Sequence, residues 1–423
     1  MSEVGVNRQK PEPKLWEKIF VVITLVFSTS AIYPLVQDKV GVVIQSGQGN
    51  LLAQVLWSGI YLITFCLIIF YWRKAIQIAF RDVILWLLVG LAFVSTLWSY
   101  APLETLRGSV ALLGNTLIGI YLVTCYSRQE FLKLLLWALG LIVVLSLGLS
   151  IFLPDVAFHN FPGPMRGVLS NKNHFGPLMA LAVITWLLYS VHSTKLRFMA
   201  ICFCLLSFIF LLLSQCITAW IIFSILLPMV IIYYLLRHKR VKMAVPIILI
   251  TLALCTFFFL ITTNLNNLLE LAGKNITLTG RTELWLIVWD MIQHRQPWFG
   301  FGYDAFWLGM EGPSGAVWEI ISWNPPHAHN GYLDVWLQLG VVGIVIFIIS
   351  FVINYLRAVL LACRQKDILQ TFPLLILTFM IIHNLSESTF MVRNNFFWIL
   401  YVVTSLQFCV EHKRFFWSAK NEH

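Results

Sequence analysis

Residues 278–283 read Leu278-Thr279-Gly280-Arg281-Thr282-Glu283, and residues 325–333 read Pro325-Pro326-His327-Ala328-His329-Asn330-Gly331-Tyr332-Leu333. Both stretches belong to a polar segment, residues 264–332, which separates two groups of long apolar runs. Irregular polar backbone and charged side chains are costly inside a bilayer. We therefore predict that this segment is one large loop outside the membrane, and that the apolar runs before and after it cross the membrane.

The composition supports a membrane protein. Hydrophobic residues make up 59% of the 423 positions, charged residues make up 11%, and the mean hydropathy is +0.82. Soluble domains carry about 25% charged residues, and apolar runs of this length match helical spans. We predict an all-α integral membrane protein with about 12 transmembrane helices. The predicted helices cover residues 17–36, 51–71, 79–98, 107–125, 131–152, 174–191, 197–213, 216–236, 243–263, 333–356, 372–389 and 395–410.

These spans divide the chain into three parts. Residues 1–263 would hold nine helices, residues 264–332 the large loop with short helices, and residues 333–423 three helices and a tail. Short loops rich in Lys and Arg stay on the cytoplasmic side, and with a cytoplasmic N-terminus that side holds 21 of the 29 basic residues. The C-terminus is then also cytoplasmic, and the large loop faces outward, to the periplasm in a bacterium with two membranes.

The net charge of +10 is explained by this bias and does not indicate nucleic-acid binding. The eight cysteines show neither a disulfide framework nor zinc-ligand spacing. The sequence thus calls for no cofactor, and the oligomeric state stays open.

Arg281 marks the start of a helix within the large loop. Gly280 is placed as N-cap and Glu283 as the third residue, which predicts a helix over residues 282–294. A cation in the first turn opposes the helix dipole, unless an anion binds between the guanidinium and the backbone N–H groups. The alternative is a carboxylate partner such as Glu270 or Glu283.

Arg166 and Lys172 lie in a second outward segment, just before a span. Ser170, Asn171 and Asn173 could cap the helix that follows. A capped helix start at membrane depth, with two cations beside it, is suited to phosphate. The alternative is a capped loop with interfacial anchors.

His327 and His329 admit three interpretations. One imidazole could be a general base, with Asn330 orienting it or a substrate hydroxyl. A metal site would need further ligands, such as Asp304, Glu311 or Glu319, and the spacing does not match a known metal motif. In the third, both side chains only hydrogen-bond at the loop end.

A last polar group, His383, Asn384, Glu387 and Arg393, surrounds the final outward loop. Ionisable groups near a span usually face the bundle interior and either mark a site or form a structural pair. We weigh a pair between Glu387 and Arg393 equally with a role in the site.

Taken in order, these motifs resemble the O-antigen ligase and exopolysaccharide polymerase superfamily. The resemblance covers about residues 166–393, and the first of its motifs is similar to that of the ExoQ-like polymerase branch. One departure is Ser214-Gln215-Cys216-Ile217-Thr218, where relatives often carry an arginine. The motifs that carry the resemblance are Arg166 to Gly176, Thr279-Gly280-Arg281-Thr282 with Trp285, Gly300-Phe301-Gly302-Tyr303, His327 to Leu333 and Gly340-Val341-Val342-Gly343.

The resemblance implies a metal-independent glycosyltransferase with a GT-C-like membrane architecture. Its donor would be an oligosaccharide on undecaprenyl diphosphate, transferred to a glycan or lipid acceptor at the outer face of the bacterial inner membrane. Arg281 would hold the diphosphate and His329 would deprotonate the acceptor, with His327 as a substitute. The missing arginine would give more of the donor binding to Arg166 or Lys172, and it favours a polymerase over a ligase that attaches glycan to lipid A-core. Further donor contacts are assigned to Asn330 and Arg393.

Two other classes remain as alternatives. A flippase or transporter of lipid-linked glycan would bury charges near the midplane and show inverted repeats, and the sequence shows neither. A structural or receptor protein would have no use for Arg166, Arg281 and His329 on one side of the membrane.

Overall fold

The computed structural model describes residues 13–31, 51–158, 161–237, 280–321, 323–365 and 367–420. Within these ranges every regular element is a helix. The predicted span at residues 243–263 and the first part of the large loop, residues 264–279, lie outside the described residues, as do Lys39 and Lys274.

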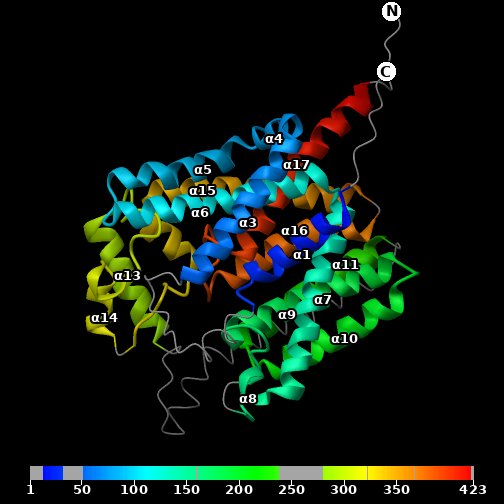
Figure 1. The fold of residues 1–423 in the computed structure, drawn as a ribbon, viewed down its shortest axis with the longest axis horizontal. Helices are drawn as coiled ribbons and strands as arrows, with labels where there is room; N and C mark the ends of the chain where they lie inside the picture. Colours follow the sequence, from blue (N-terminus) through cyan, green and yellow to red (C-terminus); the bar gives the residue numbers. More distant parts are fainter. Residues whose placement is uncertain are drawn as a thin grey trace, which may run out of the picture.

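Helices occur at the other eleven predicted positions (Figure 1). Six of them are long and apolar enough to cross a membrane, or seven when one bent pair is counted as a span. This is a multi-pass, all-helical membrane protein, whereas the number twelve stays a prediction. The long helices and their apolar neighbours are α1 (Leu15–Ser28), α3 (Leu51–Phe70), α4 (Trp72–Ala79), α5 (Val83–Val94), α6 (Pro102–Cys125), α7 (Arg128–Phe152), α9 (Lys172–His192), α10 (Arg197–Leu213), α11 (Ile217–Arg237), α15 (Gly331–Arg364), α16 (Phe372–His383) and α17 (Phe396–Lys420).

Shorter elements connect them, mostly at one end of the bundle. They are η1 (Ser95–Leu97), α8 (Pro154–Ala157), α13 (Arg281–Arg295), η2 (Gly309–Glu311), α14 (Gly315–Ile320) and η3 (Ile368–Thr371).

The predicted span at residues 79–98 differs from the structure. The chain bends by 89° between α4 and the α5–η1 pair, and Asp82 caps the new helix by accepting the N–H of Leu85 at 3.0 Å. The short α4 buries Ala75, Ile78 and Ala79 along one face only. A helix with one buried stripe is suited to lie along a surface, which explains why periodicity alone did not locate the bend.

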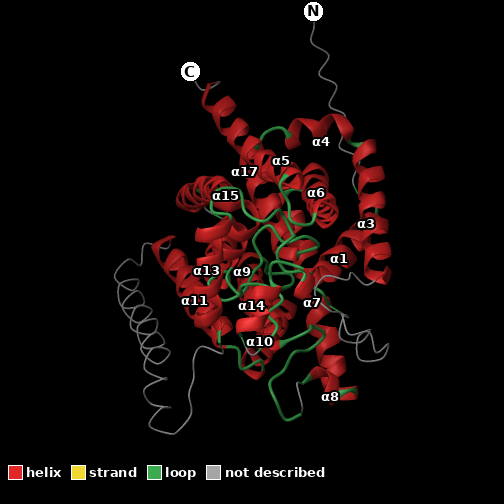
Figure 2. Cartoon of the chain, turned by 90° about the vertical axis from the view of Figure 1, so that its left-hand side faces the viewer, coloured by secondary structure: helices red, strands yellow, loops and turns green. Residues whose placement is uncertain are grey.

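Helix α9 is the centre of one half of the bundle. Almost its whole length is buried, and it packs against α7, α10, α11 and α16. In the other half α6 packs closely on α17, because a Cβ at Gly119 would lie 2.4 Å from the side chain of Val402. Figures 1 and 2 show α9 beside α10 and α11, and α6 beside α17.

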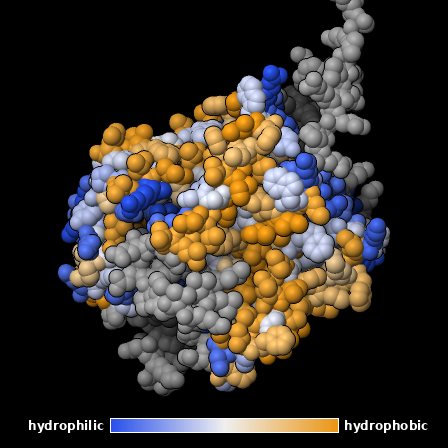
Figure 3. Space-filling model, in the orientation of Figure 1, coloured by the Kyte–Doolittle hydropathy of each residue, from blue (hydrophilic) through white to orange (hydrophobic). Residues whose placement is uncertain are grey.

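The end of the bundle that carries α13 and α14 has its own small core. Leu284, Val288 and Ile292 of α13 are fully buried and pack with Phe306 and Val317. The observed α13 confirms the predicted helix at residues 282–294 and its inward apolar face. On the face shown in Figure 3, apolar residues form a broad band, and hydrophilic residues gather towards the end that α13 and α14 occupy and towards the opposite edge.

Gly340 breaks α15 and joins it to the large loop. Its φ of 66° and ψ of −168° are accessible only to glycine without strain, and a Cβ there would lie 2.1 Å from the carbonyl oxygen of Trp298. The break frees backbone groups for the loop: Val341 N–H donates to Pro297 O at 2.9 Å, and Phe301 N–H donates to Leu337 O at 2.8 Å. The glycine motif therefore positions the loop on the helix that follows the histidines.

We expect Gly340→Ala to lower the thermal unfolding midpoint of the detergent-purified protein strongly, because both the backbone conformation and the space exclude a Cβ. Gly90→Ala in α5 is the matched control, since a Cβ there meets nothing within 4 Å. Equal midpoints for the two variants would show that the break at Gly340 is not required.

Candidate functional site

A buried carboxylate, that of Glu387, connects the two halves of the large loop. Arg281 Nη2 donates to Glu387 Oε1 at 3.0 Å, and Nη1 donates to the carbonyl of Ser386 at 2.7 Å. The Glu387 side chain is 4% exposed and that of Arg281 17%. Arg281 therefore has a carboxylate partner, which is Glu387 and not Glu283, whereas Glu270 lies outside the described residues.

His329 reaches the other oxygen of the same carboxylate. Its Nδ1 lies 3.2 Å from Glu387 Oε2 and 3.4 Å from Arg281 Nη2. An ionised carboxylate can only accept, so Nδ1–H donates to Glu387 Oε2, the nearer of the two groups, and the guanidinium lies beside the ring without a hydrogen bond to Nδ1. The lone pair is then on Nε2, which hydrogen-bonds to none of the described residues. His329 thus combines an orienting carboxylate with a free basic nitrogen.

His327 is arranged differently. The backbone N–H of His329 donates to His327 Nδ1 at 3.1 Å, and His327 Nε2 lies 3.8 Å from Glu387 Oε2. The proton of the neutral ring is therefore on Nε2, and its only lone pair is occupied. Burial, and after it the charge of His329, lowers the pKa of His327 to about 3. Of the two imidazoles, His329 is the one with a nitrogen available to take a proton.

The pKa of Glu387 reflects two opposing effects. Burial raises the pKa of a carboxyl group, but the hydrogen bond from His329 and the charges of His329, His327 and His174 hold the pKa of Glu387 well below its usual range. The group is thus a carboxylate at neutral pH.

Asp334 stabilises the backbone between His327 and His329. It accepts the N–H of Ala328 at 3.0 Å, the indole N–H of Trp307 at 2.7 Å and the hydroxyl of Ser388. Trp285 of α13 donates to the carbonyl of Ala328 at 2.8 Å. The backbone between the two histidines is fixed on both sides.

Asn330 is the N-cap of α15. Its Oδ1 accepts the N–H groups of Tyr332 at 3.0 Å and Leu333 at 3.2 Å. Next to it, Gly331 N–H donates to the carbonyl of Asn384 at 2.9 Å, and a Cβ at Gly331 would lie 2.0 Å from Asn384 Oδ1. Asn330 therefore positions the helix that follows, while its oxygen does not point to the imidazole.

Of the two alternatives for Glu387, the pair with Arg393 does not form. Arg393 Nε contacts Asp304 Oδ2 at 2.8 Å, and Glu387 binds Arg281 and the histidines instead. The turn after α16 directs Glu387 to Arg281 and the histidines of the large loop, whereas residues 392–395 line a cavity next to His327. That cavity, of about 400 Å³, is lined by His174, His327, His383 and Arg393 among others.

Arg166 and Lys172 lie in the second outward segment. Arg166 Nε donates to the carbonyl of Val156 at 2.9 Å. Lys172 is the first residue of α9, and Asn171 caps that helix by accepting the N–H of His174 at 3.0 Å. Because His174 lines the same cavity as His327, the start of α9 opens towards the histidine pair.

His327, His329 and Glu387 also form a possible metal-ligand group, with ligand atoms within 4.8 Å of one another. The third ligand of this group is Glu387, and not Asp304, Glu311 or Glu319, which the sequence analysis named. The guanidinium of Arg281, however, contacts Glu387 and lies 3.4 Å from His329 Nδ1. A positive charge thus already lies beside this group of ligand atoms, and like charges would oppose a metal ion there.

Sequence reasoning left a site role for Glu387 as one of two alternatives, without its partners, and it missed Asp334. Both are acidic residues next to long apolar runs, and that position is itself a signal, because a carboxylate there needs partners within the protein. Spacing along the chain could not supply the partners.

The low pKa of His327 predicts a pH-dependent stability. Below about pH 6.5 the unfolded chain binds a proton that the folded protein excludes, so stability falls as pH falls. Between pH 7 and pH 5 this group accounts for up to about 2 kcal/mol. We expect His327→Gln to show a smaller drop in thermal midpoint over this range than the parent, and His294→Gln, at an exposed histidine, to show the parental drop. The same drop in both variants would refute the prediction.

A search of curated proteins finds no match to this chain. Residues 202–348 match the family model described as O-Antigen ligase. The match contains Arg281, His327 and His329, whereas Glu387 and Arg393 lie beyond it. This part of the chain is therefore similar to the O-antigen ligase family, which agrees with the resemblance of the ordered motifs.

Proposed function

We propose that this protein is a polysaccharide polymerase or ligase-type glycosyltransferase that takes its glycan from undecaprenyl diphosphate. Polymerisation of exopolysaccharide or O-antigen repeat units is the preferred activity, as in the ExoQ-like branch, and the alternative is ligation to lipid A-core. The observation that carries the proposal is the joint contact of Glu387 with Arg281 and His329. One carboxylate holds a cation for the leaving diphosphate and a base for the incoming hydroxyl.

The reaction needs both groups. A sugar hydroxyl is a weak nucleophile, and the departing diphosphate carries negative charge. His329 Nε2 accepts the hydroxyl proton while the acceptor oxygen bonds to the anomeric carbon and the bond from that carbon to the diphosphate breaks. The imidazolium that forms is stabilised by Glu387 at Nδ1. Displacement in one step inverts the anomeric configuration.

Arg281 has donors left for the diphosphate. A guanidinium has five N–H groups, and the described contacts to Ser386 and Glu387 occupy one on each terminal nitrogen. Its position at the first residue of α13 adds the N–H groups of the helix start. Arg393, which lines the cavity, and Lys172, two residues before His174 in α9, supply further positive charge for the donor. Arg166 and Asn330 take part by positioning the segment before α9 and the start of α15.

The expected membrane orientation agrees with this chemistry. The bias of basic residues favours cytoplasmic termini and a site at the periplasmic face of the inner membrane, where lipid-linked glycans and their acceptors meet. We also propose a GT-C-like architecture and a metal-independent reaction, because the resemblance to the O-antigen ligase family implies both.

His329→Ala should lower turnover with a lipid-linked oligosaccharide by about a hundred- to ten-thousand-fold, the usual contribution of a general base. His327→Ala should lose less, because its lone pair is occupied in the parent. Chelators should leave the parent unchanged. Inactivation by EDTA with recovery on zinc would replace the base by a metal site, and normal turnover of His329→Ala would move the role to His327.

Arg281→Ala should abolish transfer, and Arg281→Lys should stay severely impaired, because lysine cannot reproduce bidentate contacts to carboxylate and phosphate. Arg295→Ala, in the last turn of the same helix, is the matched control and should keep activity. Near-normal turnover of Arg281→Lys would show that only a point charge is needed.

A further inference from the structure

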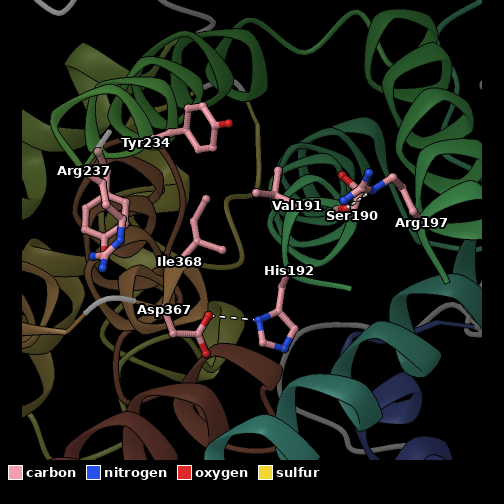
Figure 4. Close-up of a pocket in the computed structure, with 9 residues that line it drawn as sticks. Ser190, Val191, His192, Arg197, Tyr234, Arg237, Asp367 and Ile368 are labelled. Carbon is pink, nitrogen blue, oxygen red and sulfur yellow. Dashed lines mark hydrogen bonds and ion pairs between the residues drawn. The ribbon is translucent and has the colours of Figure 1, made fainter. Parts of the chain in front are cut away.

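A second cavity, of about 590 Å³, lies at the opposite end of α9 from the candidate site. The 21 residues of α9 correspond to about 31 Å of helix, which is close to the thickness of the hydrocarbon core of a bilayer. The two cavities therefore face opposite membrane surfaces. The lining residues are Ser190, Val191, His192, Arg197, Tyr233, Tyr234, Arg237, Asp367 and Ile368 (Figure 4).

The charge of this lining is unbalanced. Arg197 and Arg237 are cationic, and Asp367 is the only acidic residue among the nine. Its carboxylate is already engaged, since it contacts His192 Nδ1 at 3.0 Å, the amide of Gln129 at 3.3 Å and the N–H of Leu369 at 3.1 Å. Asp367 therefore leaves both arginines without an acidic partner in the cavity.

Both guanidinium groups are held by neutral oxygens. Arg197 Nε donates to the carbonyl of Ser190 at 3.1 Å, and Arg237 Nη1 donates to the carbonyl of Gln365 at 2.7 Å and to the hydroxyl of Tyr233 at 3.1 Å. Among the described residues no carboxylate forms an ion pair with either. Figure 4 shows the two arginines on opposite sides, with His192 and Asp367 between them. The groups are thus fixed in place, with N–H groups still available.

Both arginines lie at helix ends. Arg237 is the last residue of α11, and Arg197, the first residue of α10, donates to the carbonyl of Ser190 in the last turn of α9. A cation is favourable beside a helix C-terminus and can bind its terminal carbonyls. These contacts hold both positive charges at the cavity without neutralising either, and the cavity between them provides room for an anion.

We propose that this cavity binds a phosphate group, carried by an anionic membrane phospholipid. Guanidinium groups match phosphate oxygens, and basic pockets between helix ends recognise lipid headgroups. The neighbouring Leu196 and Leu236 are 36% and 48% exposed, so apolar surface for acyl chains adjoins the basic lining. The site is distinct from the proposed active site and does not depend on it.

The test is native mass spectrometry of the detergent-purified full chain with phosphatidylglycerol or phosphatidylcholine. We expect one tightly retained phosphatidylglycerol, and at least fivefold weaker retention of phosphatidylcholine. Arg197→Gln and Arg237→Gln should each reduce phosphatidylglycerol retention by a similar factor. Arg364→Gln, at an exposed arginine of α15 outside the cavity, is the matched control and should bind like the parent.

Competition identifies the source of the phosphate. Glycerol 3-phosphate at lipid-equivalent concentration should fail to displace phosphatidylglycerol, and displacement would assign the site to a soluble phosphate. Equal retention of both lipids by the unmodified protein would overturn the proposal even if the variants fold poorly, and so would unchanged retention in both arginine variants. If the unmodified protein retains phosphatidylglycerol but fails to transfer glycan from a lipid-linked donor, the proposed function is wrong and the lipid site stands.

Discussion

The arrangement depends on the burial of one charge. The Glu387 carboxylate is removed from water, and such a group is tolerated only when cations and hydrogen-bond donors surround it. Arg281 and the two histidines meet that requirement from two distant parts of the large loop. Removing one partner of a buried pair typically costs about 3–5 kcal/mol, so the carboxylate holds the loop on the bundle as well as orienting the imidazole.

The surrounding residues also hold the large loop and its histidines in place. Asp334 and Trp285 fix the backbone between the histidines. The break at Gly340 allows residues 297–301 of the loop to hydrogen-bond to α15. The result is an imidazole and a guanidinium held on one carboxylate, next to a cavity that His174 near the start of α9 also lines. Such pre-organisation is what the proposed glycosyl transfer without a protein nucleophile requires.

Much of this could be predicted from the sequence, because apolar length and helix-start signals are local. The helix at Arg281, the cap at Asn171 and the positions of the described spans follow from such signals. The bend before α5, the pairing of Arg393 with Asp304 and the role of Glu387 do not, since they depend on which segments meet in three dimensions. Asn330 illustrates the difference: its place beside His329 suggested chemistry, whereas its hydrogen bonds make it a helix cap.

The most direct measurement compares the purified parent with Glu387→Gln in the transfer of a lipid-linked oligosaccharide, with donor binding and elution profile recorded in parallel. The amide keeps the size of the side chain but loses the charge that holds Arg281 and His329. The account predicts a correctly eluting protein with turnover reduced by at least about a hundredfold, while Glu319→Gln in the same loop keeps parental turnover. Parental turnover by Glu387→Gln would contradict it.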